Sequence, residues 1–379
     1  MNDLKDLEEI YKSRRANLCT WMAQNSIGMV LIEDSEANRN PALRYFCGLP
    51  SDGILGISIN GLSILSPWDE NLAAKIAFAD IVAGFNQFNR SATAAAAAIA
   101  EMANLPAGAR IEISPATAYP RFLQFVDKLN KYDVLCRDNG AFNYITRLRA
   151  CKDKAEIELT QKAAEFTGVL IDQIEQGLRD GSIKTETDVA LLIERAAHSN
   201  GCENTGFDTL AAGPARSFGI HCFPGYTDGD FGSDGLSILD FGLIYGGYTS
   251  DVTITVARGE LTEQQQTMLD LVQKAYDTCL NLYKPGLSIK AAAEKAQSIF
   301  AKEKMHMPHG LGHGIGLQIH EWPFVKETAG DDEVFEKGMI VTLEPGLYDP
   351  VAGGVRLEND VLITEDGNQV LTRSKIIRL

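Results

Sequence analysis

The spacing of apolar residues along the first 150 positions predicts alternating helices and strands. Helical spacing runs from residue 4 to residue 23, and a short unbroken apolar run at 29–32 is typical of a buried strand. Two further strand-like runs, 54–59 and 62–65, are separated by Asn60-Gly61, a dipeptide that favours a tight hairpin turn. Later segments repeat both patterns: helical at 73–79, 92–103 and 120–131, and strand-like at 111–113 and 134–136. We therefore expect an α/β unit in this half.

Beyond residue 150 the pattern changes to long helices followed by glycine-rich strands. Helical periodicity covers 154–178 and, after the candidate N-cap Thr185, 186–197. The remaining segments are strand-like at 205–248, helical at 262–283 and 289–303, and strand-like again from Met339 onward. This order favours an α+β domain whose helices pack on a strongly bent antiparallel sheet.

A basic stretch at 147–153 separates these two patterns, and we place a domain boundary there. A chain of 379 residues is too long for one ordinary domain. The predicted organisation is a smaller N-terminal α/β domain over residues 1–150 and a C-terminal domain over residues 151–379.

Charge is distributed unevenly between the two halves. The formal net charge is −16, and residues 151–379 contribute −15 of it, with all six histidines. Such an acidic chain is a poor candidate for binding the phosphate backbone of nucleic acids or an anionic membrane surface. Most of these carboxylates are expected to form a solvated surface. Because the imidazoles share this half, we look for chemistry there.

The cysteines and the N-terminus indicate a reducing compartment. The seven cysteines are widely spaced and contain no C-x-x-C, so neither a disulfide framework nor a zinc ribbon is expected. Residues 1–15 are charged and lack the apolar core of a signal peptide. The sequence contains no run of about 18 apolar residues, so no membrane span is predicted. These features predict a cytoplasmic protein.

The segment 237–251 contains a candidate pair of converging carboxylates. Gly246-Gly247 suits a two-residue hairpin turn, and such a turn pairs residue 240 with residue 253. Asp240 and Asp251 then share one face of the sheet as diagonal neighbours. Two carboxylates converging on an apolar sheet repel each other unless a cation lies between them. The alternative is an exposed hairpin with two solvated aspartates.

Three histidines occur in the glycine-rich segment 309–321. Its alternating glycines exclude a stable helix, and its spacing matches neither H-E-x-x-H nor a phosphate-binding loop. A single histidine here would most often be a packed core residue. Three of them, His309, His313 and His320, indicate a tight backbone that brings imidazoles close to a ligand.

Two glutamates and one arginine lie in strand-like settings near the C-terminus. Glu344 ends the apolar run 339–343, and Glu358 lies in the run 354–363. Arg356 is two positions before Glu358, so both side chains are expected on one face of a single strand. Alone, each glutamate would be interpreted as a surface residue. Beside the upstream Asp and His clusters, both are interpreted as inward-facing ligands.

These residues together predict a metal site. Carboxylates with one imidazole suit a pair of divalent ions such as Mn²⁺, Co²⁺ or Zn²⁺. Two metals bridged by water can generate hydroxide near neutral pH and stabilise a tetrahedral intermediate. The sequence has no G-x-S-x-G motif, and Cys222 beside His221 is only an adjacency.

The order Asp240, Asp251, His313, Glu344, Glu358 resembles the pita-bread metallopeptidase family, which includes methionine aminopeptidase, aminopeptidase P, prolidase and the metal-free relative creatinase. The segments 312–316 and 344–346 look like its signature blocks. The resemblance extends over essentially the whole chain, since residues 1–150 resemble the creatinase/prolidase N-terminal domain. It implies a homodimer with a pita-bread catalytic domain, acting on proline-containing peptides.

The resemblance also implies a role for each matching residue. Asp240 would bind one metal, Asp251 and Glu358 would bridge both, and His313 and Glu344 would complete the shell of the second. Glu344 would in addition be the general base for the metal-bridging water. Three further residues match the family. His320 and His221 would contact the substrate, and Arg356 would lie close to the metals. His309 is interpreted as structural, and His198 and His306 are assigned no role.

The resemblance favours the Xaa-Pro branch of the family, that is, prolidase (Xaa-Pro dipeptidase) or aminopeptidase P. Methionine aminopeptidases usually lack the N-terminal domain and the arginine two positions before the last glutamate, and creatinase-like relatives lose the metal ligands. The implied reaction is hydrolysis of the bond between an N-terminal residue and proline. Ile254, where many relatives have arginine, and the segment around His221 depart from the family pattern. Two alternatives stay open: hydrolysis of a non-peptide amide, and a non-catalytic pita-bread binding module.

Overall fold

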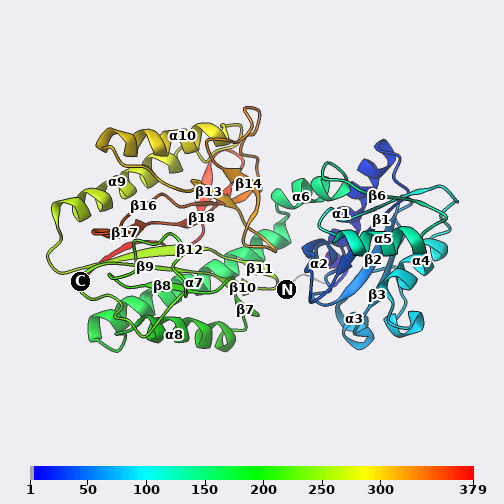
Figure 1. Cartoon of the computed structure of the whole chain (residues 1–379), viewed down its shortest axis with the longest axis horizontal. Helices are drawn as coiled ribbons and strands as arrows, with labels where there is room; N and C mark the ends of the chain where they lie inside the picture. The colour runs from blue at the N-terminus through cyan, green and yellow to red at the C-terminus, as the bar shows by residue number, and fades with distance from the viewer. Residues whose placement is uncertain (1–3) are drawn as a thin grey trace. The chain divides into compact units, whose positions relative to one another are not determined.

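The computed structural model describes residues 4–379, so residues 1–3 of the N-terminal segment lie outside it. These residues form two compact units, the first ending at Arg149 and the second beginning at Ala150 (Figure 1). No helix among residues 4–379 is both long enough and apolar enough to cross a membrane.

The first unit is built around a six-stranded mixed sheet in the order β4-β3-β2-β1-β5-β6. Its strands are β1 (Met29–Asp34), β2 (Gly53–Ser58), β3 (Ser63–Pro67), β4 (Ile81–Val82), β5 (Arg110–Ile113) and β6 (Asp133–Cys136). Its helices are α1 (Leu4–Gln24), α2 (Pro41–Cys47), α3 (Glu70–Ile76), η1 (Phe85–Phe88), α4 (Ala92–Met102), α5 (Tyr119–Lys128) and α6 (Ala141–Ala150). The antiparallel hairpin β2–β3 surrounds Asn60-Gly61, as expected. The predicted α/β character of this unit is confirmed.

The helices of the first unit differ from the prediction at several places, and α2 and η1 were not expected. The helix expected at 73–79 starts at Glu70, because the carboxylate of Asp69 accepts a hydrogen bond from the amide of Leu72 at 2.9 Å and caps it there. Helix α6 was not expected, since its arginines were interpreted as a basic linker. Arg147 and Arg149 instead lie in its last turn, where cations interact favourably with the helix dipole.

In the second unit two pairs of helices enclose bent sheets. The helices are α7 (Lys154–Asp180), α8 (Glu186–Ser199), α9 (Glu263–Leu280), α10 (Ile289–Phe300) and η2 (Ala301–Glu303). The strands are β7 (Asn204–Thr205), β8 (Leu210–Ala212), β9 (Gly235–Phe241), β10 (Leu243–Tyr245), β11 (Tyr248–Thr249), β12 (Val252–Arg258), β13 (Gly312–Gly314), β14 (Glu321–Val325), β15 (Ile340–Leu343), β16 (Gly346–Asp349), β17 (Gly353–Arg356), β18 (Asn359–Ile363), β19 (Asn368–Val370) and β20 (Ile376–Arg378).

Each helix pair buries the outer face of one sheet. Helices α7 and α8 pack on the four-stranded sheet β20-β12-β9-β8, where Ile171 and Ile193 contact a core that contains Phe241. Helices α9 and α10 pack on the five-stranded sheet β14-β13-β15-β18-β19, where Val272 shares a core with Val341. Figure 1 shows the strands between the two helix pairs.

The long helices begin where the sequence provides capping boxes. Asp153 pairs reciprocally with Glu156 at the start of α7, and Thr185 does so with Asp188 at the start of α8. In each box one side chain accepts from the helix backbone and the other accepts from the N-cap backbone, so that otherwise unsatisfied amides are paired. The predicted N-cap at Thr185 is confirmed.

The hairpin predicted around Gly246-Gly247 is present. Thr253 lies opposite Asp240, and Tyr245 lies opposite Tyr248, which is the expected register. Both glycines adopt positive φ angles, which L-residues with a side chain rarely adopt. The strand expected at 354–363 is different: it is divided into β17 and β18, which pair with β16 and β15 respectively. The break lies at residues 357 and 358, where Glu358 forms an isolated bridge with Thr253.

One buried hydrogen bond joins α7 to this hairpin. The hydroxyl of Tyr248 donates to the carboxylate of Glu156 at 2.9 Å, and both residues are buried. We expect Tyr248→Phe to lower the free energy of unfolding by about 1–3 kcal/mol, because a buried carboxylate loses a donor. Urea unfolding followed by circular dichroism measures this change.

The matched control is Tyr245→Phe in the same hairpin. In the part of the chain that the structure describes, the hydroxyl of Tyr245 has no hydrogen-bond partner, so this variant should unfold close to the wild type. Equal effects of the two substitutions would contradict a stabilising role for the Tyr248–Glu156 bond.

Candidate metal centre

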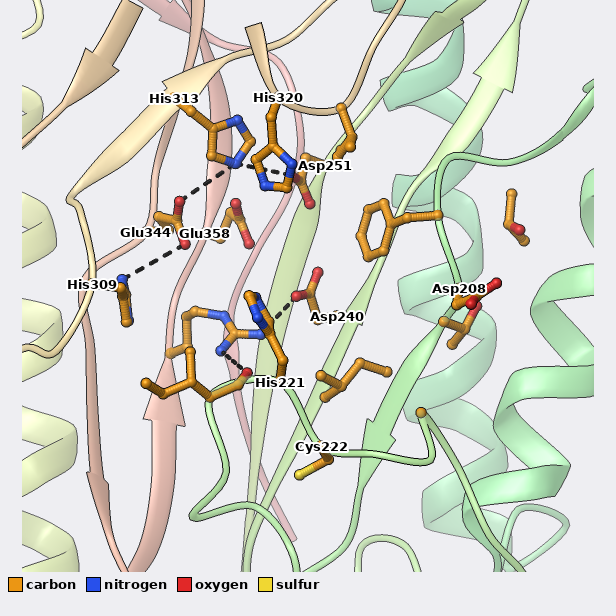
Figure 2. A pocket seen from close by; sticks show the side chains of 18 of the residues that line it. Asp208, His221, Cys222, Asp240, Asp251, His309, His313, His320, Glu344 and Glu358 are labelled. Atoms are coloured by element: carbon orange, nitrogen blue, oxygen red, sulfur yellow. Dashed lines mark hydrogen bonds and ion pairs between the residues drawn. The ribbon is translucent and has the colours of Figure 1, made fainter. Parts of the chain in front are cut away.

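The ends of several strands bring acidic and imidazole side chains to one cavity of about 880 Å³. Asp240 comes from β9, Asp251 directly precedes β12, and His313 is the middle residue of β13. Glu344 follows β15, and Glu358 lies between β17 and β18. Figure 2 shows the five side chains facing a common space. Residues more than 100 positions apart in the sequence thus share one site.

Glycines around His313 allow the strands to approach closely. A Cβ atom on Gly312 would lie 1.9 Å from the carbonyl oxygen of Thr342, and one on Gly314 would lie 2.5 Å from that of Trp322. The amide of His313 donates to the hydroxyl of Thr342 at 3.0 Å. The alternating glycines therefore place the imidazole between two neighbouring backbones, as the sequence indicated.

The polar atoms are spaced as ligands around a shared cation would be. The Nε2 atom of His313 lies 3.6 Å from Oδ2 of Asp251 and 3.5 Å from Oε1 of Glu344. One potential ligand atom from each of Asp251, His313 and Glu358 lies within 4.8 Å of the others. These separations are too long for strong hydrogen bonds, but they suit atoms that each lie about 2.0–2.2 Å from one metal ion.

Two buried carboxylate oxygens in the cavity accept no hydrogen bond within residues 4–379. Within residues 4–379, Oδ1 of Asp240 and Oδ1 of Asp251 are buried without a hydrogen-bond donor. Buried carboxylate oxygens without a donor or a cation are costly. Carboxylates and one imidazole are the donor set that suits hard or borderline divalent ions. The residues present therefore fit a divalent metal.

Burial and mutual repulsion shift the pKa values of these groups toward their neutral forms. Burial and the charge of Glu358 hold the pKa of Asp251 well above its usual range, and burial and the charge of Glu344 do the same for Glu358. Burial raises the pKa of Glu344 to about 8. Burial and the neighbouring His320 lower the pKa of His313 to about 4. A cation would compensate the charge that these carboxylates cannot carry together.

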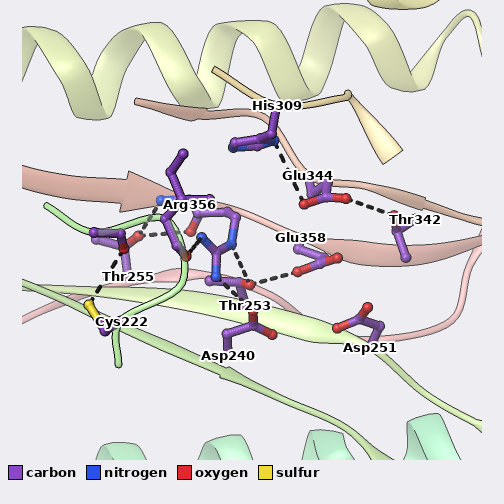
Figure 3. A network of polar contacts seen from close by, with 12 residues as sticks. Cys222, Asp240, Asp251, Thr253, Thr255, His309, Thr342, Glu344, Arg356 and Glu358 are labelled. Carbon is purple, nitrogen blue, oxygen red and sulfur yellow. Dashed lines mark hydrogen bonds and ion pairs between the residues drawn. The ribbon is translucent and has the colours of Figure 1, made fainter. Parts of the chain in front are cut away.

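Arg356 connects two of the acidic groups. Its Nη2 donates to Oδ2 of Asp240 at 2.6 Å, and its Nε donates to the hydroxyl of Thr253 at 2.9 Å (Figure 3). The same hydroxyl donates to Oε2 of Glu358 at 2.6 Å. One guanidinium thus holds Asp240 directly and Glu358 through Thr253. Thr253 was missed by sequence reasoning, although its pairing with Asp240 was predicted.

A second branch of this network leads from Arg356 through Tyr348 to His309, which also lines the cavity. The Nη1 of Arg356 donates to the hydroxyl of Tyr348 at 2.7 Å, and that hydroxyl lies 3.0 Å from Nε2 of His309. The Nδ1 of His309 lies 3.9 Å from Oε2 of Glu344. The interpretation of His309 as merely structural is therefore incomplete, because the residue lines the cavity. Tyr348 was also missed, since only its position two residues beyond Gly346 could have indicated it.

The other histidines divide into two groups. His320 and His221 line the cavity and are exposed to it, and the ring of His320 lies edge-on to that of His313 with centroids 4.4 Å apart. His198 lies exposed on α8, and His306 lines a separate, smaller pocket of about 260 Å³. Only the first group is placed to meet a substrate at the carboxylates.

Comparisons with known proteins point to one family. The model of metallopeptidase family M24 matches residues 158–365. The Xaa-Pro dipeptidase of Pyrococcus furiosus is 36% identical over 233 residues, which cover 61% of this chain and 65% of that relative, just under two thirds of its length. The Xaa-Pro dipeptidase of Pyrococcus horikoshii is 32% identical over 253 residues, covering 66% and 70%. The crystal structure of the prolidase from Pyrococcus horikoshii OT3 superposes with a TM-score of 0.81 at 27% identity, covering 96% of this chain and 99% of that one.

The fold and these similarities place the chain in the class of proteins with the pita-bread metallopeptidase fold. The chain belongs to metallopeptidase family M24, and its similarities lie with the prolidase branch of that family. The family and the α+β fold class predicted from the sequence are confirmed, and the family implies divalent metal ions.

The raised pKa of Glu344 makes the stability of metal-stripped protein depend on pH. The pKa of Glu344 in the folded protein is about 8, compared with the ordinary value of 4.5. The protonated side chain therefore contributes stability that is complete below pH 4.5 and is lost as the pH rises through about 8. His309 and His313 have pKa values lowered from 6.5 to about 4, so their opposing effect is confined to pH values below 6.5. We expect the melting temperature of chelator-treated protein to fall as the pH rises from 6.5 to 8.

Differential scanning fluorimetry in a series of buffers measures this slope. Glu344→Gln should flatten it, because the substituted side chain does not titrate. Saturating Mn²⁺ should also flatten it, because a bound cation stabilises the ionised carboxylates. A melting temperature that rises across this window in the stripped wild type would contradict the assignment.

Proposed function

We propose that this protein is a metal-dependent exopeptidase that hydrolyses the bond between an N-terminal residue and proline. The observation that carries the proposal is the convergence of four buried or half-buried carboxylates and one imidazole in a single cavity. Relatives named Xaa-Pro dipeptidase and prolidase support the choice of substrate. They favour a peptidase over the hydrolysis of another amide. A binding module would have no need for buried carboxylates that repel one another.

Two divalent ions, Mn²⁺, Co²⁺ or Zn²⁺, are proposed to occupy the cavity. Asp240 would hold one ion, Asp251 and Glu358 would bridge the pair, and His313 and Glu344 would complete the other shell. The buried oxygens of Asp240 and Asp251 without donors support this assignment. Bound ions of this kind supply a polarised water molecule at neutral pH and an electrophilic contact for the substrate carbonyl.

Glu344 is proposed to accept the proton of the attacking water. Its carboxylate faces the cavity, with Oε1 3.5 Å from His313 and Oε2 3.9 Å from His309. The hydroxyl of Thr342 donates weakly to Oε1 at 3.4 Å, which leaves the carboxylate otherwise available to accept a proton. The same group can then deliver that proton to the leaving proline nitrogen, which needs one to depart as an amine.

His320 and His221 are proposed to face the substrate. Both line the cavity and are exposed, and Figure 2 shows their side chains around the same space as the carboxylates. Burial and the neighbouring His221 lower the pKa of His320, so its ring is neutral near pH 7. A neutral imidazole can donate one N–H to the carbonyl oxygen of the scissile bond as negative charge develops there.

Arg356 is proposed to stabilise the negative charge of the metal-binding residues. Its guanidinium lies against Asp240 and is fully enclosed, so it offsets part of the acidic charge.

The apolar residues Phe207, Leu210 and Phe324 line the same cavity and offer contact surface for a proline ring. A cytoplasmic location, a homodimer and manganese as one of the candidate metals stay predictions from the sequence and the family resemblance.

Metal dependence is tested with stripped and refilled protein. We expect chelator-treated wild type to be inactive on Xaa-Pro dipeptides and Xaa-Pro-Xaa tripeptides, and to recover on at least one of them with Mn²⁺, Co²⁺ or Zn²⁺. His313→Ala should lose bound metal in elemental analysis, while His198→Ala, which lies outside the cavity, should retain it. The peptidase proposal fails if both substrate classes stay uncleaved in every metal state, and the ligand assignment fails if His313→Ala keeps its metal.

The proposed general base is tested by Glu344→Gln at saturating metal. Since a positioned base contributes about 10²–10⁴-fold, we expect kcat to fall within that range. The exposed Glu365, which pairs with Lys337 at the surface, supplies the control variant Glu365→Gln, whose kcat should equal the wild-type value. A kcat for Glu344→Gln within twofold of wild type at full metal occupancy would exclude Glu344 as the base.

A further inference from the structure

A buried carboxylate outside the cavity organises the loop that carries His221. Glu186 is the first residue of α8 and only 1% of its surface is exposed. Its side chain accepts four hydrogen bonds from the segment 213–227. The donors are the Gly213 amide at 2.8 Å, Nη1 of Arg216 at 2.6 Å, the Thr227 amide at 2.7 Å and the Thr227 hydroxyl at 2.6 Å.

These contacts join the two ends of the loop to each other. Gly213 begins the segment directly after β8, and Thr227 closes it, so one carboxylate spans both ends. Backbone bonds from the start of α8 strengthen the second end: the amide of Glu186 donates to Gly229 at 2.9 Å and that of Thr187 donates to Thr227 at 3.0 Å. The loop is therefore closed at its base by helix α8.

Arg216 extends this support from the base to the middle of the loop. While Nη1 of its guanidinium lies on Glu186, Nη2 donates to the carbonyl oxygen of Pro224. The carbonyl oxygen of Arg216 in turn accepts a hydrogen bond from the thiol of Cys222 at 2.8 Å. Cys222, which directly follows His221, and Pro224 are thus both tied to the arginine that Glu186 holds.

The tip of the loop faces the metal centre. His221 lines the cavity, and the carbonyl oxygen of the preceding Ile220 accepts a hydrogen bond from Nη1 of Arg356 at 3.2 Å. Arg356 also holds Asp240. The position of His221 over the carboxylates therefore depends on two anchors, Arg356 at the tip and Glu186 at the base.

Only an ionised carboxylate satisfies the four donors at once. An amide in its place would turn its NH₂ group toward at least one of these N–H or O–H donors and would remove the negative charge that pairs with Arg216, whose side chain is 22% exposed. The carboxylate also lies in the first turn of α8, where the helix dipole favours negative charge.

We propose that Glu186 is a positioning residue that sets His221 over the metal centre. The effect on substrate turnover rests on the proposed function, whereas the effect on the loop does not. Glu186 touches neither the metal ligands nor the cavity itself. Its effect on the reaction passes through the loop and therefore through His221.

The first test measures the loop without reference to activity. In hydrogen–deuterium exchange, Glu186→Gln should speed exchange of peptides covering 214–226 and leave those covering 309–320 unchanged. The matched control is Glu263→Gln, since Glu263 also follows a threonine N-cap at the start of a helix but is exposed. Unchanged exchange of 214–226 in Glu186→Gln would overturn the proposal, even if no peptide substrate were found.

The second test measures coupling to His221 in metal-loaded enzyme. Since small displacements of a substrate-contacting group are costly, we expect Glu186→Gln to lower kcat/KM on an Xaa-Pro substrate by about 10- to 100-fold with unchanged metal content. In a His221→Ala background the same change should cost less than about twofold, because the group it positions is already missing. An equal loss in both backgrounds, or no loss in the wild type, would overturn the proposal.

Arg216→Met supplies a variant that leaves the buried carboxylate in place. It removes the ion pair with Glu186 and the link to the carbonyl oxygen of Pro224, while Gly213 and Thr227 still donate three hydrogen bonds to the carboxylate. Because the buried carboxylate keeps these donors, the variant should fold even if Glu186→Gln does not. We expect it to show the same non-additivity with His221→Ala and a smaller gain in exchange of 214–226. Equal losses of kcat/KM with and without His221 would overturn the proposal for this variant too.

Discussion

Repulsion between buried carboxylates is the constraint on which the catalytic unit depends. Burial and neighbouring negative charge raise the pKa values of Asp251, Glu344 and Glu358 together. Such a cluster is stable only if protons, a cation or a fixed positive charge compensates it. The protein supplies the fixed charge through Arg356, which lies on Asp240 and reaches Glu358 through Thr253. The remaining negative charge makes the cavity suitable for divalent ions.

The architecture of the second unit explains how such a cluster can be held in place. Two helix pairs bury the outer faces of two bent sheets, so the strands cannot move apart to relieve the repulsion. Hydrogen bonds from neighbouring polar residues orient the acidic groups further. For example, the carboxylate of Asp360 accepts a hydrogen bond from the backbone amide of Asp251 at 3.0 Å. The groups proposed to meet the substrate lie instead on loops. His221 in particular lies on a loop that is held by one anchor at its base, Glu186, and by another at its tip, Arg356.

Local patterns predicted those parts of the structure that depend on near neighbours. The register that places Thr253 opposite Asp240 followed from the turn residues Gly246-Gly247, because a two-residue hairpin has one pairing. The N-cap at Thr185 followed equally from local hydrogen bonding. Local patterns failed at α6, where arginines at a helix end resembled a linker, and at 354–363. There the chain passes from one sheet to another at residues 357 and 358, and a continuous apolar run gives no sign of that change of partner.

The sequence alone determined the fold class, the family and the set of groups from which the proposed metal ligands come, because these depend on residue types in a particular order. It did not determine which neighbouring residues hold these groups or which residue supports the loop of His221. Thr253, Tyr348 and Glu186 carry no local signature, since a threonine in a strand or a glutamate at a helix start is common in any protein. Thr253 meets Arg356 across 103 positions of sequence, and Glu186 meets Gly213 across 27. Tyr348 accepts from Arg356 only eight positions away, but its other partner, His309, lies 39 positions before it. Long-range packing brings each donor to its acceptor, and no periodicity along the chain encodes such a contact.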